Sequence, residues 1–198
     1  MLGAAGIRLA TNMGGVYLGD KSLDPLMEEL NRRKALIIIH PVRARQRSEN
    51  AITGGVAAIY EYPADTTRAV LNMAANRIMT RYPDIKWIIP HCGAFLPYMQ
   101  HRFAGVSGIL ASLGMMEQTD IKAELSKLYY DIAGDPEPQL DMLRIIAEDT
   151  HIVYGSDFPH SPANVIIKKK EHFDANGKYK MMRSKIYSEN AANLLKGK

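Results

Sequence analysis

The chain has 198 residues, of which 46% are hydrophobic and 23% are charged, and it carries a formal net charge of +4. This composition suits one globular domain spanning residues 1–198, and the longest apolar run, Ala35–Ile39, is too short to cross a membrane. Basic residues are scattered, which argues against nucleic acid as a partner, and a lone cysteine, Cys92, excludes an internal disulfide and favours a cytoplasmic location.

Short apolar runs alternate with helical segments along the chain. Strands are predicted over residues 7–12, 36–40, 86–90, 128–134 and 152–154. Helices are predicted over residues 24–33, 66–81, 95–114, 138–147, 163–173 and 181–195, with Asp24 and Asp65 as N-caps. A polar loop is expected over residues 43–55, and no hairpin is expected. This alternation predicts an α/β fold in which helices cover a parallel sheet.

Three of the predicted strands end in a residue that can bind a metal or move a proton. His40 ends one apolar run, His91 follows the next, and Asp157 follows the Gly-Ser pair after the last. The carboxyl ends of parallel strands lie on one face of a sheet or barrel, so these three side chains are expected to converge there.

Several motifs occur together in an order that resembles the amidohydrolase-related family, whose members include aminocarboxymuconate-semialdehyde decarboxylase and decarboxylases of hydroxybenzoates and methylsalicylate. The resemblance covers nearly the whole chain. It rests on Tyr17-Leu18-Gly19-Asp20, His40-Pro41, Asp65-Thr66-Thr67-Arg68-Ala69, Arg81-Tyr82-Pro83-Asp84, His91-Cys92-Gly93-Ala94-Phe95-Leu96-Pro97, Tyr130-Asp131-Ile132-Ala133-Gly134 and Gly155-Ser156-Asp157-Phe158-Pro159.

This resemblance implies a (β/α)8 barrel of the TIM type with a divalent metal, expected to be Zn²⁺, at its C-terminal face. His40 and Asp157 are implied as metal ligands, and His91 and Asp157 as catalytic residues. Arg102 and Asn12 are implied as substrate-binding residues, with Arg102 reaching across from a partner subunit. The resemblance also implies a homodimer or larger homo-oligomer.

The chain departs from the family pattern because it contains no His-x-His or Glu-x-His pair to supply the remaining ligands. About five strands are predicted where a full barrel has eight. The chain is therefore expected to be the C-terminal part of such a barrel, without its N-terminal strands. With two ligands, it is expected to bind Zn²⁺ weakly and to turn over slowly or not at all.

The resemblance favours a metal-dependent decarboxylase that acts on a small aromatic or unsaturated carboxylate. A metal-dependent hydrolase of the same family and a catalytically inactive fragment that persists as an oligomer are the alternatives. A nucleotide-binding domain is disfavoured because no phosphate-binding glycine motif follows a strand. Lys168-Lys169-Lys170 is interpreted as a solvated helix face, and Cys92 as a small buried residue. The remaining histidines are expected in loops or on the surface: His101, His151, His160 and His172.

Overall fold

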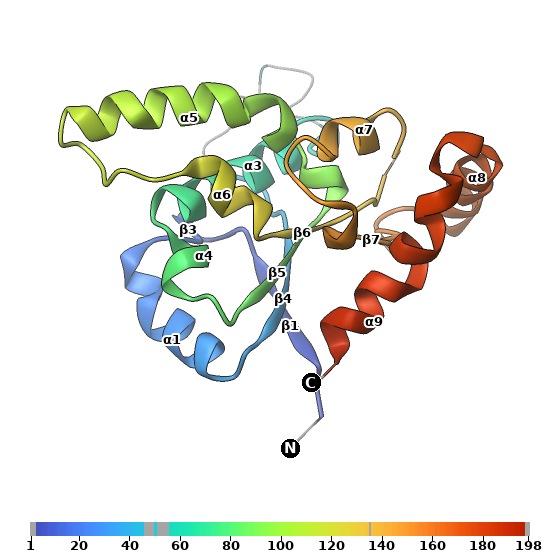
Figure 1. Cartoon of the computed structure of the whole chain (residues 1–198), viewed down its shortest axis with the longest axis horizontal. Helices are drawn as coiled ribbons and strands as arrows, with labels where there is room; N and C mark the ends of the chain where they lie inside the picture. Colours follow the sequence, from blue (N-terminus) through green and yellow to red (C-terminus); the bar gives the residue numbers. More distant parts are fainter. Residues whose placement is uncertain (1–2, 46–49, 51–55, 135, 197–198) are drawn as a thin grey trace.

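The computed structural model describes residues 3–45, 50, 56–134 and 136–196. Its centre is a five-stranded sheet with the order β1-β4-β5-β6-β7, in which every neighbouring pair is parallel (Figure 1). The parallel α/β architecture predicted from the sequence is therefore confirmed. The strands are β1 (Gly6–Ala10), β4 (Leu36–His40), β5 (Lys86–Ile89), β6 (Tyr129–Asp131) and β7 (Ile152–Val153).

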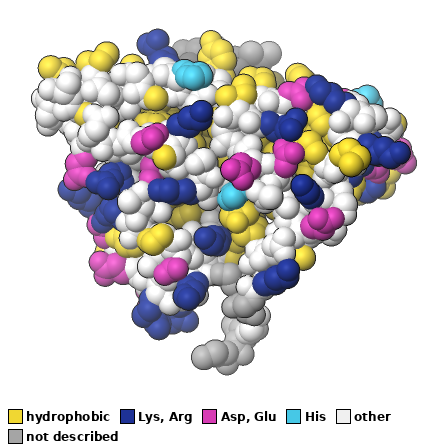
Figure 2. Space-filling model, viewed as in Figure 1, with side chains coloured by type: hydrophobic (Ala, Val, Ile, Leu, Met, Phe, Trp, Pro, Cys, Tyr) yellow, Lys and Arg dark blue, Asp and Glu magenta, His cyan; other side chains and the backbone are white. Residues whose placement is uncertain are grey.

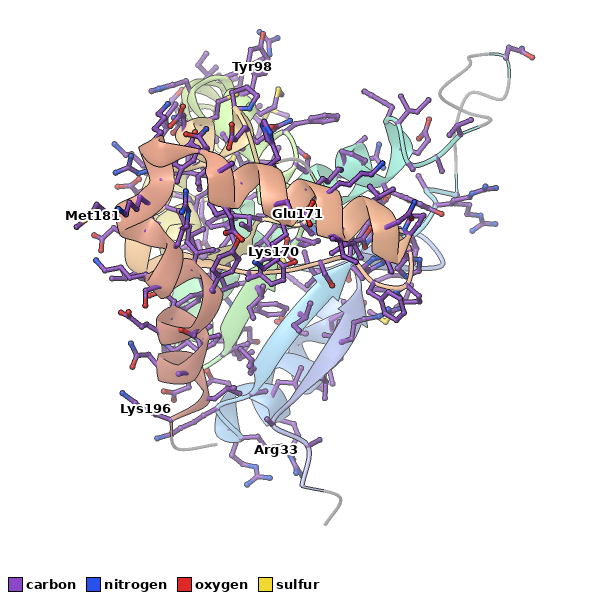
Figure 3. All side chains as sticks on the ribbon, turned by 90° about the vertical axis from the view of Figure 1, so that its right-hand side faces the viewer. Arg33, Tyr98, Lys170, Glu171, Met181 and Lys196 are labelled. Atoms are coloured by element: carbon purple, nitrogen blue, oxygen red, sulfur yellow. The ribbon has the colours of Figure 1, made fainter. Side chains whose placement is uncertain are left out.

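Helices follow the strands: a larger layer covers one face of the sheet, and a smaller group lies beside β7 (Figure 1). The larger layer contains α1 (Asp24–Arg32), α3 (Glu61–Ala75), α4 (Ile78–Arg81), α5 (Leu96–Ser112), α6 (Ile121–Ser126) and α7 (Gln139–Leu143). The smaller group is α8 (Ala163–Ala175) and α9 (Asn190–Leu195), which Figure 3 shows in front of the strands. No helix in the described part of the chain combines the length and apolarity needed to cross a bilayer.

Successive side chains along each strand alternate, and this divides the apolar ones between the two faces of the sheet. Ile37 and Ile39 of β4 lie in the main core, together with Trp87 and Ile89 of β5. The intervening residues face the other way, because successive strand residues point to opposite faces. Leu36 and Ile88 there pack with Val153 and Leu194 in a small second cluster. Charges of both signs are interspersed over the face shown in Figure 2.

The predicted helix over residues 66–81 begins earlier and is broken. It starts at Glu61 as α3, and Arg77 adopts a left-handed conformation (φ 54°) that separates α3 from α4. Asp65 is therefore inside the first part of a helix and is not its N-cap. Asp24 likewise is the first residue of α1, after the N-cap position at Leu23.

A short hairpin and a short helix were not predicted. Asn12–Met13 (β2) and Val16–Tyr17 (β3) form an antiparallel hairpin, turned by Gly14 and Gly15 at positive φ values of 63° and 99°. Only glycine adopts such angles without strain. The other element is α6, capped by the Asp120 carboxylate, which accepts a hydrogen bond from the Ala123 amide. Most of the predicted loop 43–55 lies outside the described residues.

The hairpin and α3 are joined by a buried carboxylate. Asp65 is completely buried and accepts hydrogen bonds from the hydroxyl of Thr11, the amide of Asn12 and the hydroxyl of Tyr17. Arg68 donates to the Tyr17 hydroxyl at 2.7 Å and lies 3.5 Å from Asp65. These contacts fix the end of β1 against the helix that follows β4.

The predicted final helix over residues 181–195 is a succession of different turns. A 3₁₀ helix covers Gly177–Met182, a π-helical turn covers Lys185–Glu189, and α9 completes the segment. Asn190 connects this segment to the sheet, because its buried amide donates hydrogen bonds to the carbonyls of Asp149 and Ile152 at 2.7 Å.

Candidate metal and catalytic site

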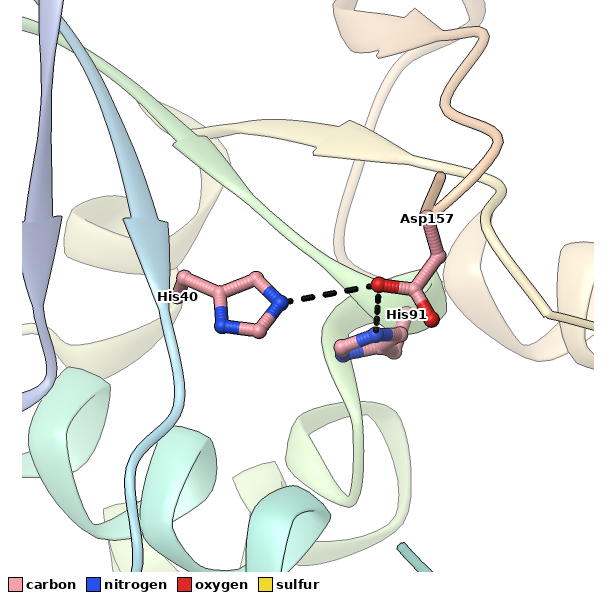
Figure 4. Close-up of side chains that lie close together, drawn as sticks. All are labelled: His40, His91 and Asp157. Carbon is pink, nitrogen blue, oxygen red and sulfur yellow. Dashed lines mark ion pairs between the residues drawn. The ribbon is translucent and has the colours of Figure 1, made fainter. Parts of the chain in front are cut away.

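The carboxyl ends of three strands bring His40, His91 and Asp157 together (Figure 4). His40 is the last residue of β4, His91 begins the turn after β5, and Asp157 follows β7. These strands are parallel members of one sheet, so their carboxyl ends share one edge. The convergence expected from the sequence is therefore present in the structure.

Both imidazoles face the same carboxylate oxygen. Nε2 of His40 lies 3.5 Å from Oδ1 of Asp157, and Nε2 of His91 lies 3.6 Å from that oxygen. One potential ligand atom from each residue lies within 4.8 Å of the others. All three side chains are partly buried, so they are shielded from solvent on most sides but remain reachable.

The backbone at this edge is held in uncommon conformations. His91, Cys92 and Asp157 have φ values of 58°, 51° and 60°. Residues other than glycine rarely adopt the left-handed region, and each such residue costs about 1–3 kcal/mol unless its surroundings enforce it. Strain of this kind concentrates at functional sites, which agrees with the position of these residues around the three converging side chains.

The ring of His40 is oriented by its own loop. Its Nδ1 lies 3.1 Å from the carbonyl oxygen of Pro41, an acceptor only, so Nδ1 carries the proton and donates. Nε2 is then left with a lone pair that faces Asp157, and this buried atom has no hydrogen-bond partner among the described residues. Burial lowers the pKa of His40, so the ring favours the neutral form that binds metals.

The ring of His91 has more freedom. Its buried Nδ1 has no hydrogen-bond partner within the described part of the chain, so no protein group fixes its tautomer. The backbone of His91 is nevertheless held firmly, because its amide donates to Oδ1 of Asp131 at 2.9 Å. A histidine with a fixed backbone and an unfixed proton is suited to proton transfer.

Asp131 is a site residue that the sequence reasoning missed. It ends β6, and its Oδ1 also accepts a hydrogen bond from the amide of Ala133 at 2.9 Å. Burial raises the pKa of Asp131, and the nearby charge of Asp157 adds to this effect. Gly155 is needed beside it, since a Cβ at that position would lie 2.6 Å from the Asp131 carboxyl carbon. The predicted strand over residues 128–134 continued past Asp131, so the sequence did not place Asp131 at a strand end.

An open cavity of about 830 Å³ lies over the three converging residues. His160 also lines it and stacks on His40, with ring centroids 4.7 Å apart and an angle of 26° between the planes. The sequence offered no reason to separate His160 from the other surface histidines. The structure places it in the wall of the site, because the loop after Asp157 turns back across the end of β4.

The two expected substrate-binding residues lie elsewhere. Asn12 is buried in the Asp65 network and is not among the described residues that line the cavity. Arg102 is exposed on α5, also outside that lining. It lies in a row of exposed apolar side chains on one face of the helix, called the α5 stripe here: Tyr98, Val106, Ile109 and Leu113.

The donor atoms fit a divalent cation. Two ligands placed tetrahedrally at about 2.0–2.1 Å from Zn²⁺ lie about 3.3 Å apart, close to the 3.5 and 3.6 Å observed here. The unpartnered Nε2 of His40 is a second indication, because buried polar atoms in proteins normally have a partner. His40 and Asp157 could hold the ion, with His91 beside it.

A family model described as amidohydrolase matches residues 1–197. Among curated proteins, decarboxylase yanB of Aspergillus niger is 35% identical and covers 89% of this chain and 51% of its own length. The 6-methylsalicylic acid decarboxylase of Penicillium expansum is 31% identical and covers 88% of this chain and 54% of its own. The chain thus spans about half the length of these relatives.

Solved structures show the same fold. A crystal structure named amidohydrolase II has a TM-score of 0.90 and 30% identity, covering 98% of this chain and 62% of the other. The 5-carboxyvanillate decarboxylase of Novosphingobium aromaticivorans, solved with manganese and 4-hydroxy-3-methoxy-5-nitrobenzoic acid, has a TM-score of 0.84 and 20% identity. That match covers 98% of this chain and 57% of the other.

Proposed function

The chain belongs to the amidohydrolase family, and from this premise we propose that it forms the catalytic part of a metal-dependent decarboxylase acting on a small aromatic carboxylate. The observation that carries the proposal is the meeting of His40, His91 and Asp157 at the carboxyl ends of the strands. The names of the two relatives, one a decarboxylase and one a 6-methylsalicylic acid decarboxylase, support this reaction and this substrate class.

In the proposed mechanism, a divalent cation on His40 and Asp157 would supply a Lewis acid that orients the substrate oxygens and offsets the charge of the carboxylate. The hydrogen bond from His40 to Pro41 keeps the Nε2 lone pair available at that position. Zn²⁺ suits nitrogen and carboxylate donors, and manganese is the ion named with the solved 5-carboxyvanillate decarboxylase. We propose Zn²⁺ for this chain.

His91 is the proposed proton donor. Its protonated imidazole gives a proton to the carbon of the substrate's aromatic ring that carries the carboxylate. The bond between that carbon and the carboxylate then breaks. The electron pair of the bond returns to the aromatic ring, CO2 leaves, and His91 regains a proton from solvent. Asp131 supports this step by holding the backbone of His91 in place, at a distance of 2.9 Å.

A homodimer that associates through the α5 stripe is part of the proposal. Tyr98, Arg102 and Val106 follow at intervals of four residues, so they lie on one side of the helix, and Tyr98 projects outward in Figure 3. Large exposed apolar side chains in a row are characteristic of interaction surfaces. This arrangement supports a dimer in which Arg102 reaches the partner's cavity. Cys92 is buried and is the single cysteine of the chain, which supports a reducing, cytoplasmic location.

The proposal is tested by product analysis with the whole chain. The protein is incubated with 2-hydroxy-6-methylbenzoate and an excess of Zn²⁺ or Mn²⁺, because two protein ligands are expected to bind the ion weakly. Nuclear magnetic resonance then follows the conversion of the substrate to the corresponding phenol. Formation of the phenol supports a decarboxylase, whereas hydrolysis of an ester or amide analogue without phenol formation would favour a hydrolase.

A further inference from the structure

Three cationic side chains line the cavity: Arg8, Lys169 and Arg43, of which Arg43 is exposed in the segment after β4. Arg8 comes from β1, on one side of His40, and Lys169 comes from α8. Neither forms an ion pair with any residue in the described ranges. Asp157 is the sole acidic residue among the described residues that line the cavity. The cavity therefore has more positive than negative groups to offer a ligand.

The sheet register shows why Arg8 faces the site. Ala10 pairs with His40 and Arg8 pairs with Ile38 across the parallel β1–β4 ladder. Arg8 is two residues before Ala10, so it points to the same face as His40. A rise of about 3.3 Å per residue and a strand spacing of about 4.8 Å put its Cα roughly 8 Å from that of His40. An arginine side chain can span this distance.

Lys169 differs from the two lysines beside it. Lys168 and Lys170 are exposed, and Lys170 pairs with Asp174 at 2.5 Å, as expected for a solvated helix face. Lys169 is half-buried and lies in the cavity wall. Lys169 and Lys170 both border a small second cavity that Phe173 and Tyr187 also line. The basic run on α8 thus includes one lysine directed inward.

We infer that Arg8 and Lys169 together recognise a second carboxylate where the substrate carries one, so that aromatic dicarboxylates bind more tightly than monocarboxylates such as 2-hydroxy-6-methylbenzoate. This inference rests on the proposed function. In the proposed mechanism the metal ion would already offset the charge of the departing carboxylate. Free cations are therefore better suited to a carboxylate that remains. The planar fork of Arg8 matches a carboxylate in shape as well as charge.

This inference is tested by a binding measurement, which is separate from any measurement of turnover. Isothermal titration calorimetry compares 5-hydroxyisophthalate with 3-hydroxybenzoate on the whole chain, with and without Mn²⁺. The dicarboxylate should bind at least about tenfold more tightly, the usual scale of a charge-assisted hydrogen bond. Arg8→Gln and Lys169→Gln should each remove most of this preference, and Arg8→Lys should retain part of it.

Lys168→Gln is the matched control, since it removes the same charge from an exposed position on the same helix and should leave the preference unchanged. Equal affinity for the two ligands in the unmodified chain, or a preference that survives both cavity variants, would overturn the inference. Failure of phenol formation with the preference intact would overturn only the proposed decarboxylation. Phenol formation without any preference would overturn only the second-carboxylate site.

Discussion

Nε2 of His40 lies 3.5 Å from Oδ1 of Asp157, although β5 and β6 separate their strands in the sheet. The ends of β4 and β7 can meet in this way because parallel strands twist and the connecting turns fold inward at the carboxyl edge. His91, which follows β5, fills the space between them at 3.6 Å from the same oxygen. Both imidazole rings therefore lie next to the same oxygen of Asp157.

Replacing His40 with alanine should greatly reduce divalent-metal binding. The variant loses the imidazole nitrogen whose lone pair faces Asp157, and a carboxylate alone is a poor ligand set for Zn²⁺. Equilibrium dialysis followed by elemental analysis measures the change. His101→Ala removes an exposed histidine from α5 and serves as the control, with unchanged metal content. Equal metal content in both variants would show that the ion lies elsewhere.

The positions of the strand ends could be predicted from the sequence because each ends in a local signal. His40 precedes a proline, His91 follows one, and Asp157 follows a Gly-Ser pair. Asp131 also ends its strand, β6, but the sequence predicted a strand that continued to Gly134 and so placed Asp131 inside it. The proposed ligand and catalytic roles of these residues remain predictions that the geometry supports.

The role of Asp65 could not be predicted because it depends on distant parts of the chain. Asp-Thr-Thr is a good local match to a helix N-cap, but Asp65 instead accepts hydrogen bonds from Thr11 and Tyr17 across the start of the fold. Tertiary contacts of this kind leave no periodic pattern. The same applies to His160, whose place beside His40 depends on how the loop after Asp157 turns.

Asp65→Ala should destabilise the fold strongly. The change leaves the buried donors of Thr11, Asn12 and Tyr17 without their acceptor, and an unsatisfied buried polar group costs about 1–3 kcal/mol. We expect a loss of about 3 kcal/mol or more in the free energy of unfolding, measured by urea denaturation. Tyr17→Phe, which removes one donor only, should cost less. Similar stability for Asp65→Ala and the unmodified chain would contradict the network's role.

Stability should fall in mild acid partly because of His151. Burial lowers the pKa of His151 below its usual 6.5, so the unfolded chain binds this proton more readily than the folded protein does. The stability contributed by the neutral ring is therefore complete above about pH 6.5. It is lost as the pH falls through the lower pKa of the folded state.

Thermal denaturation of the metal-free protein between about pH 5 and pH 7.5 measures this effect. His151→Phe should flatten the dependence of Tm on pH, because phenylalanine can keep the stack on Tyr129, now at 4.3 Å between centroids, without titrating. His101→Phe, at an exposed histidine on α5, is the control and should leave the slope unchanged. An unaltered slope in His151→Phe would disprove the contribution of this ring.

The double substitution Ile109→Asp and Leu113→Asp should convert the proposed dimer to a monomer. These side chains are 61% and 66% exposed in the chain alone, so charge there disturbs no core but opposes burial against a partner. Sedimentation velocity measures the shift. Met181→Asp, at a methionine that is 89% exposed outside the α5 stripe, is the control. A monomeric unmodified chain at micromolar concentration would contradict the dimer.

The central claim is tested most directly by measuring the release of ¹³CO2 from carboxyl-labelled 2-hydroxy-6-methylbenzoate. The release is compared between the unmodified chain and His91→Asn at equal metal content. The proposed role of His91 predicts metal-dependent release that stops on chelation and falls by about a hundredfold or more in the variant, the usual scale for a general acid. Release that persists after chelation, or that is unchanged in His91→Asn, would contradict the claim, as would no release above the protein-free blank with saturating Zn²⁺ or Mn²⁺.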